Sequence, residues 1–127
     1  MNMCFCGSDL NYKDCCEPFH KALQFAPTAE TLMRSRYSAY VLQNADYLLA
    51  TWYKSTRPKE LDFSQETLRW QKLEILHTKK GGRTDDKGKV EFNAFYLQDG
   101  QTRLMHEISR FKKLAGKWFY VDGVIQD

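Results

Sequence analysis

The spacing of apolar positions changes from helical to strand-like about halfway along the chain. From Thr28, a residue type that caps helices, apolar and aromatic residues recur every three or four positions as far as Val41, which predicts an amphipathic helix. A second short helix is expected to begin at a cap on Asp46, and a third helical piece is expected between Ser64 and Trp70. The first half of the body is therefore expected to be helical.

Beyond Trp70 the apolar residues alternate with polar ones, as they do in half-buried strands. Four strands are expected, and Asp99-Gly100 is a typical hairpin turn between the second and the third. Helices followed by an antiparallel meander indicate an α+β fold, in which the helices cover one face of the sheet. The expected strands span residues 73–78, 90–97, 101–113 and 117–124.

The size and composition fit one globular domain with a small appendage. The chain has 127 residues, of which 43% are hydrophobic and 28% charged, and such values argue against long-range disorder. Its formal net charge of +3 is too small to indicate a nucleic-acid-binding protein by itself. No apolar run approaches a length of about 18 residues, which a membrane span requires. The polar start, Met1 to Leu10, lacks the features of a signal peptide, so a cytoplasmic location is expected.

All four cysteines lie within the first sixteen residues. A local cluster in a chain without an export signal is typical of a metal site rather than of a disulfide framework. The pattern is C-x-C, eight residues, then C-C, and Gly7 lets backbone amides approach the thiolates. Because four thiolates leave no open coordination position, the expected metal is a structural Zn²⁺ ion. The expected ligands are Cys4, Cys6, Cys15 and Cys16.

Other interpretations of this segment stay open. The cysteines could be free thiols or a redox pair, although the adjacent Cys15 and Cys16 can bridge only with strain and no C-x-x-C motif is present. His20, four residues beyond Cys16, could replace one cysteine as a ligand.

The cysteine segment closely resembles the SEC-C motif. Cys4-Phe5-Cys6-Gly7-Ser8, Tyr12-Lys13 and Cys15-Cys16 carry the resemblance. This zinc motif is found at the C-terminus of the translocation ATPase SecA, where it forms a partner-binding tail, and in other proteins. The resemblance implies a zinc knuckle, as we call the cysteine-bearing segment up to Cys16, that binds a protein of the translocation machinery, a chaperone or the ribosome.

A wider resemblance covers nearly the whole chain. It is carried by the segments Leu32–Tyr40, Asp46–Leu48, Thr51-Trp52, Glu107–Phe111 and Trp118–Gly123. These segments are similar to those of the YchJ family, whose members join a SEC-C motif to a domain of the nuclear transport factor 2-like fold. That fold is a cone, in which a curved antiparallel sheet surrounds a long helix. The resemblance implies a zinc motif and linker at residues 1–25 and an α+β domain at residues 26–127, and the fold often forms homodimers.

The cone could also enclose a pocket for a polar small molecule. His106 and Glu107 are neighbours on one strand and point to opposite faces, so they form no dyad and we assign no catalytic residue. An enzymatic pocket in the cone stays open as an alternative. Arg36 is expected to form a buried ion pair with Glu107 or Asp122. The candidate pocket residues are Arg36, Tyr37, Tyr40, Glu107, Arg110, Trp118 and Asp122.

Basic turns offer a third kind of binding surface. Lys79, Lys80 and Arg83 lie in one predicted turn, and Lys112 lies near the end of a strand. Such residues could bind RNA of the ribosome or another polyanion.

Overall fold

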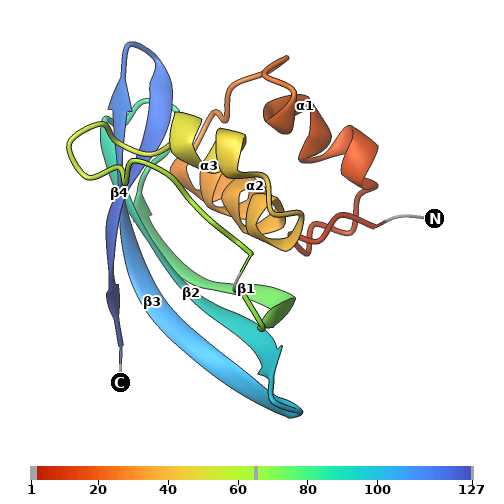
Figure 1. The fold of residues 1–127 in the computed structure, drawn as a ribbon. Coiled ribbons are helices and arrows are strands. Elements are labelled where there is room, and N and C mark those ends of the chain that lie inside the picture. The colour runs from red at the N-terminus through yellow and green to blue at the C-terminus, as the bar shows by residue number, and fades with distance from the viewer. Residues whose placement is uncertain (1–2, 65, 127) are drawn as a thin grey trace.

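The computed structural model describes residues 3–64 and 66–126. Four short or medium helical segments precede a single four-stranded antiparallel sheet with the strand order β1-β2-β3-β4 (Figure 1). The α+β class and the antiparallel meander are confirmed. The elements are η1 (Tyr12–Asp14), α1 (Glu17–His20), α2 (Ala29–Val41), α3 (Ala45–Ala50), β1 (Arg69–Lys80), β2 (Lys87–Gln98), β3 (Gln101–Leu114) and β4 (Lys117–Ile125).

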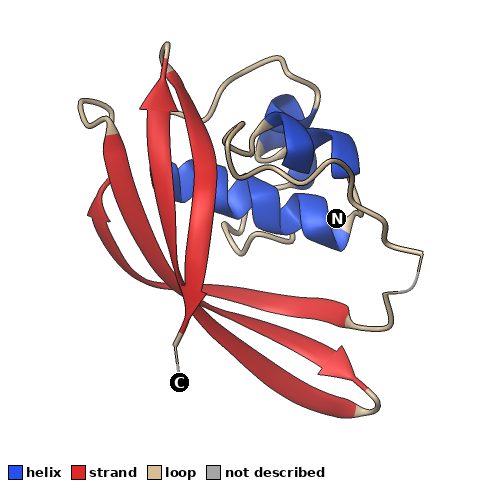
Figure 2. Cartoon of the chain, turned by 60° about the vertical axis from the view of Figure 1, so that its left-hand side comes forward, coloured by secondary structure: helices blue, strands red, loops and turns tan. Residues whose placement is uncertain are grey.

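The sheet is strongly curved, and all the helices lie on its concave side (Figures 1 and 2). Helix α2 contacts β1, β2 and β4, so it fills the centre of the cone, while α1 and the knuckle lie against α2. No helix within residues 3–64 and 66–126 is long and apolar enough to cross a membrane.

The core lies between α2 and the concave face of the sheet. On β2 the buried Val90, Phe92 and Ala94 alternate with exposed or half-buried polar residues, as the period of a strand requires. They pack against Leu32 and other apolar side chains of α2. Burying the larger of these side chains, such as Val90, Phe92 and Leu32, contributes about 1.5–3 kcal/mol each, so this interface fixes the position of α2.

Helix caps were predicted correctly for α2 and two residues too late for α3. Thr28 caps α2 by accepting a hydrogen bond from the amide of Thr31 (3.1 Å). At α3 the cap is Asn44, which accepts from the amide of Tyr47 (3.1 Å), and Asp46 lies inside the first turn. Asn44 and Asp46 are both good capping residues, and the residue nearer the end of α2 takes the role.

The helical piece predicted between Ser64 and Trp70 is wrong. The described residues there hold no helix, and Trp70 belongs to β1, where it pairs with Tyr96 of β2. The side chain of Asp62 accepts a hydrogen bond from the amide of Ser64 (2.9 Å), which makes a turn where a cap was expected. Cross-strand pairing therefore overrides a weak local helix signal.

The free edge of β4 is partly covered by the chain that follows α3. The amide of Tyr53 donates to the carbonyl of Tyr120 (2.7 Å), and the amide of Tyr120 donates to the carbonyl of Thr51 (2.8 Å). The hydroxyl of Thr56 donates to the carbonyl of Val121 (2.6 Å). Residues 51–56 thus run along the sheet like a very short additional strand.

Candidate metal centre and inner cavity

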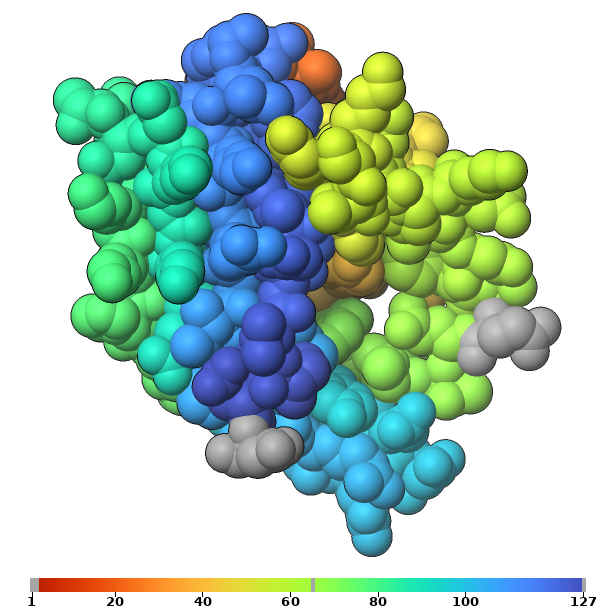
Figure 3. All heavy atoms as spheres, turned by 90° about the vertical axis from the view of Figure 1, so that its left-hand side faces the viewer, coloured from red at the N-terminus to blue at the C-terminus, as the bar shows by residue number. Residues whose placement is uncertain are grey.

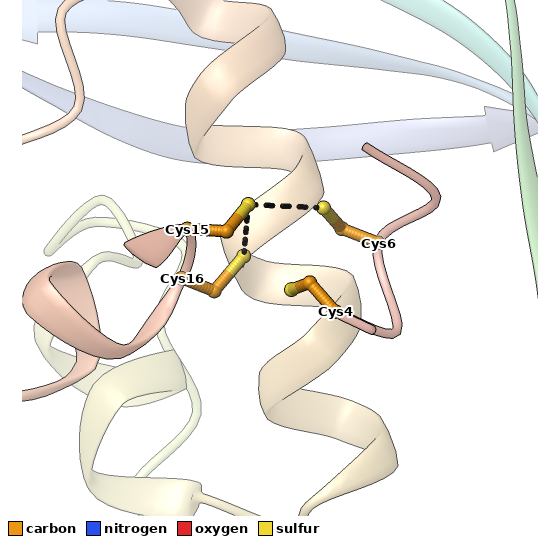
Figure 4. A group of neighbouring side chains, drawn as sticks. All are labelled: Cys4, Cys6, Cys15 and Cys16. Atoms are coloured by element: carbon orange, nitrogen blue, oxygen red, sulfur yellow. Dashed lines mark hydrogen bonds between the residues drawn. The ribbon is translucent and has the colours of Figure 1, made fainter. Parts of the chain in front are cut away.

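The four cysteines meet beside α2. Residues 3–11 form a small loop, closed by a bridge between Met3 and Asn11 and by the bond from the amide of Cys4 to the carbonyl of Leu10 (2.7 Å). Cys15 and Cys16 follow at the junction of η1 and α1. Figure 4 shows the two pairs of sulfur atoms pointing toward one common point.

The sulfur positions fit a tetrahedral metal ion. All four Sγ atoms lie within 4.8 Å of one another, with 3.6 Å between Cys6 and Cys15 and 3.9 Å between Cys15 and Cys16. A tetrahedron with metal–sulfur bonds of about 2.3 Å has sulfur–sulfur distances of about 3.8 Å. Gly7, at φ +85°, makes the turn that returns the chain after Cys6. The donor set and its spacing therefore suit a closed, four-coordinate site.

Without a cation the sulfurs must share protons. Hydrogen bonds from Cys16 and Cys4 lower the pKa of the Cys6 thiol far below its ordinary value, and bonds to Cys4 and Cys6 raise the pKa of Cys16 far above it. Burial raises the pKa of Cys15 to about 11. One sulfur ionises at the expense of its neighbours, so four thiolates this close together require a positive ion between them.

His20 is not one of the convergent ligands, contrary to the alternative considered from sequence. Its Nδ1 accepts from the hydroxyl of Tyr12 (2.6 Å), and its Nε2 donates to the carbonyl of Ser35 on α2 (2.8 Å). The partners fix the neutral tautomer, and burial lowers the pKa of His20. His20 therefore ties the knuckle to α2.

Arg34 makes a second tie between the knuckle and α2. Its Nη1 donates to the carbonyl of Cys6 (2.7 Å), and its Nε is held by Glu30 one helical turn earlier (3.1 Å). The hydrogen bond to the Cys6 carbonyl fixes the orientation of the cysteine loop relative to α2. It also brings the positive charge of Arg34 near the sulfur atoms.

A cavity of about 230 Å³ lies between α2 and the sheet. Of the residues expected to form a pocket, four line it, and the aromatic Trp70 and Tyr120 are additional. Trp70 was missed because its segment was expected to be helical. The lining residues are Met33, Arg36, Tyr37, Tyr40, Trp70, Phe92, Ala94, Met105, Glu107, Ser109 and Tyr120.

Arg36 is 2% exposed, and the ion pair expected for it is not formed. Its Nη1 donates both to the carbonyl of Leu48 and to Oγ1 of Thr51 (2.7 Å each). The guanidinium carbon lies 4.6 Å from the ring centre of Tyr120 and 5.0 Å from that of Trp52. Among residues 3–64 and 66–126, no carboxylate comes within 4.0 Å of it. Aromatic faces and neutral acceptors thus take the place of the expected carboxylate.

The side chain of Glu107 is held toward the cavity by Ser109 of the same strand and by the space that Gly123 leaves on β4. The buried hydroxyl of Ser109 donates to Oε2 of Glu107 (2.6 Å). Gly123 of β4 lies directly beneath this carboxylate, and a Cβ atom added there would overlap with Oε2 of Glu107. The absence of a side chain at position 123 therefore gives the Glu107 carboxylate its place.

The other three residues expected in the pocket lie elsewhere. Arg110 and Asp122 pair with each other on the convex face, with 2.6 Å between Nε and Oδ1. A bulge after Arg110 changes the register with β4, which is why Asp122 does not share the inner face with Tyr120. Trp118 is buried in the core, and its indole nitrogen donates to the carbonyl of Pro27 (3.2 Å).

Replacing His20 with Gln is expected to lower the free energy of unfolding by about 1–3 kcal/mol, because it leaves Tyr12 and Ser35 without their buried partner. Chemical denaturation measures this loss, and amide hydrogen exchange should locate it in residues 3–20 and the facing turn of α2. Lys13→Ala, at an exposed position of the same segment, serves as the control and should change stability by less than about 0.5 kcal/mol. Equal stability of both variants would contradict the structural role of His20.

Comparison with known proteins agrees with these features. Residues 28–123 match the family model of the YchJ middle NTF2-like domain, and residues 2–18 match the SEC-C motif. A UPF0225 protein of Photorhabdus laumondii is 44% identical, over 96% of this chain and 80% of its own length. Another from Streptomyces coelicolor is 46% identical, over 98% of this chain and 96% of its own length.

Two solved structures have the same fold throughout this chain. A SEC-C motif containing protein from Rhodopseudomonas palustris superimposes with a TM-score of 0.87 at 34% identity and covers all of both chains. A second, from Psychrobacter arcticus, gives a TM-score of 0.80 at 27% identity and covers all of this chain and 84% of its own. The cone, the cysteine cluster and these matches place the chain in the YchJ (UPF0225) family of proteins with a SEC-C motif and an NTF2-like domain.

Proposed function

We propose that this protein is a binding module whose knuckle holds a structural Zn²⁺ ion and presents an apolar surface to a protein partner. The convergence of four cysteine sulfurs in a segment that exposes three apolar side chains carries this proposal. Met3, Phe5 and Leu10 are 48%, 47% and 52% exposed, and all three belong to the loop of residues 3–11 that the bridge between Met3 and Asn11 closes. A small loop cannot bury such side chains, and exposed apolar groups gathered in one place are typical of interaction sites.

Zinc fits the donor set better than other common ions. Four thiolates are soft ligands, and tetrahedral sulfur sites select Zn²⁺ in proteins without iron–sulfur chemistry. Cys4, Cys6, Cys15 and Cys16 would hold the ion, and their full set leaves no position for water or substrate. Zn²⁺ would therefore supply folding free energy and a rigid loop rather than a catalytic step.

A groove beside the knuckle gives the partner a place to lie. It has a volume of about 430 Å³ and runs between the cysteine loop and the start of β1. Met3 and Phe5 form one side, and Trp70 and Leu73 lie on the other. Because β1 is an edge strand, an extended peptide could lay apolar side chains into this groove. Proteins of the translocation machinery, chaperones and ribosomal proteins are the candidates that the SEC-C motif suggests.

Removing the metal tests the knuckle. The purified protein is expected to contain one Zn²⁺ per chain by native mass spectrometry, and Cys4→Ser or a chelator should abolish amide protection in residues 3–16. The sheet should stay protected, because its core is separate from the cysteine cluster. Zn²⁺ binding contributes about 10–16 kcal/mol to the folding of small zinc domains, so we expect the knuckle to lose its amide protection completely when the metal is removed. A metal-free protein with an ordered knuckle would refute the zinc proposal.

Replacing Phe5 with Asp tests the partner surface. Tagged protein incubated with a lysate of the cells that express it is expected to retain a partner, identified by mass spectrometry, that Phe5→Asp no longer retains. Phe25→Asp is the matched control, because Phe25 is 59% exposed but lies outside the knuckle. Zinc content must be unchanged in both variants. If the two variants retain the same proteins as the unmodified chain, the knuckle is not the binding surface.

Arg36 favours a second function, the binding of a small polar molecule in the inner cavity. A buried guanidinium without a carboxylate is costly. The cavity is also lined by Glu107, whose carboxylate Ser109 orients, and by Trp70, whose indole N–H has no partner among the described residues. A ligand with a carboxylate for Arg36 and a hydrogen-bond donor for Glu107 would satisfy both. The aromatic walls suit a flat molecule.

The cavity is tested with 4-hydroxybenzoate as the probe. Calorimetry should detect binding to the unmodified protein, and Gly123→Ala should weaken it at least about tenfold, because the added Cβ displaces the Glu107 carboxylate that holds the hydroxyl. Gly100→Ala, which introduces the same Cβ into a distant hairpin turn with no atom within 4 Å, should leave affinity unchanged. No binding to the unmodified protein at millimolar probe would end this proposal.

A further inference from the structure

Six cationic side chains from three adjacent strands surround a hollow of about 290 Å³ at one end of the sheet. Most of them project from the convex face, which is turned away from the helices and is seen in Figure 3. Phe111 and Val121 contribute apolar surface to the hollow. We call this site the basic hollow. Its cations are Lys79, Lys80, Lys87, Lys89, Arg110 and Lys112.

Strand register places like charges directly opposite one another. Lys89 of β2 faces Lys79 of β1 on one side and Arg110 of β3 on the other. Lys87 likewise faces Lys112. Directly opposed like charges destabilise an antiparallel sheet, so this arrangement weakens the fold. The sequence analysis named Lys79, Lys80 and Lys112, but only the strand register shows that Lys87, Lys89 and Arg110 join them. Arg83, which was expected with them, does not line the hollow.

Little within the fold neutralises the basic hollow. Asp122 is bound to Arg110, and the nearby Glu91 is bound to His106 (2.6 Å). In the part of the chain that the structure describes, no carboxylate lies within 4.0 Å of any of the five lysines. The six cations exceed the net charge of the whole chain, +3, so the positive charge is concentrated here and the remaining surface is close to neutral or acidic.

We propose that the basic hollow binds the phosphate backbone of a single-stranded nucleic acid. Adjacent strands are about 4.8 Å apart, so the row from Lys79 to Arg110 spans about 10 Å and can contact successive phosphates of one strand. The hollow has the volume of about ten water molecules, which admits a phosphate and sugar but not a duplex. A flat lipid surface would not enter it.

Tyr53 places an aromatic ring at the edge of the basic hollow. The ring lies 5.1 Å from Nζ of Lys112 and is only partly buried. Its backbone is fixed by the bond to Tyr120, so the position of the ring is set by the sheet. A basic groove next to an aromatic side chain is the usual combination in single-strand binding, because cations hold the backbone while the ring stacks on a base.

Fluorescence anisotropy with a labelled twelve-nucleotide oligouridylate tests the proposal on the full zinc-loaded chain. Four phosphate contacts predict a slope of about −2.8 in a plot of log affinity against log salt, and hence about 50-fold weaker binding at 200 mM than at 50 mM salt. Lys89→Glu should weaken binding at 50 mM salt at least about tenfold and make the slope shallower. Lys13→Glu, which makes the same charge change on the exposed surface of the knuckle, should alter affinity less than about twofold.

A stability measurement accompanies the binding assay. Because Lys89 stands between two cations, Lys89→Gln should leave the protein folded and should reduce the rise of its melting temperature with added salt. Absence of oligonucleotide binding at 50 mM salt, or equal losses in Lys89→Glu and Lys13→Glu, would overturn the proposal. Binding to vesicles of anionic phospholipid through Lys89, with none to the oligonucleotide, would also overturn it in favour of a membrane surface. Tighter binding of a duplex of the same length than of the single strand would likewise overturn the proposal of a single-strand site.

Discussion

Successive residues of α2 point in directions about 100° apart around the helix axis. This rotation determines which site each residue of α2 reaches. Arg34 points to the carbonyl of Cys6, the Ser35 carbonyl accepts from His20, and Arg36 is buried beside the cavity. Tyr37 then packs in the core between helix and sheet. Four consecutive residues thus serve the knuckle, the link to α1, the cavity and the core. Because the core contacts fix the apolar side of α2, the knuckle, the link to α1 and the cavity keep fixed positions relative to one another.

Local features of this protein could be read from the sequence, whereas pairings between distant segments could not. The cysteine spacing, the Thr28 cap and the strand alternation each depend on residues close in the chain, and the structure has the corresponding cluster, helix and sheet. Trp70 was misplaced because its environment is a partner strand. Arg36 was expected to need a carboxylate, and its actual neighbours, the carbonyl of Leu48 and two aromatic rings, are set by the position of α3 and β4.

The polar groups of the body divide between the two faces of the sheet according to what surrounds them. On the concave face Arg36 and Glu107 are near neutral or aromatic groups, where unpaired charge is costly and a bound molecule would gain most from it. On the convex face Arg110 and Lys89 are exposed to solvent. Their charges are hydrated there, so they carry little desolvation cost and attract large anions over several ångströms. The two proposed kinds of recognition would therefore use opposite faces of the same sheet.

The segment that follows α3 has a consequence for how copies of this protein coexist at high concentration. Thr51 and Tyr53 occupy the backbone groups of Tyr120 that would otherwise face outward from the last strand, and Thr56 occupies the carbonyl of Val121. An exposed strand margin is a template on which neighbouring molecules polymerise into continuous sheets. Here the chain supplies its own blocking strand, so growth of aggregates from this margin is closed off in the middle of β4.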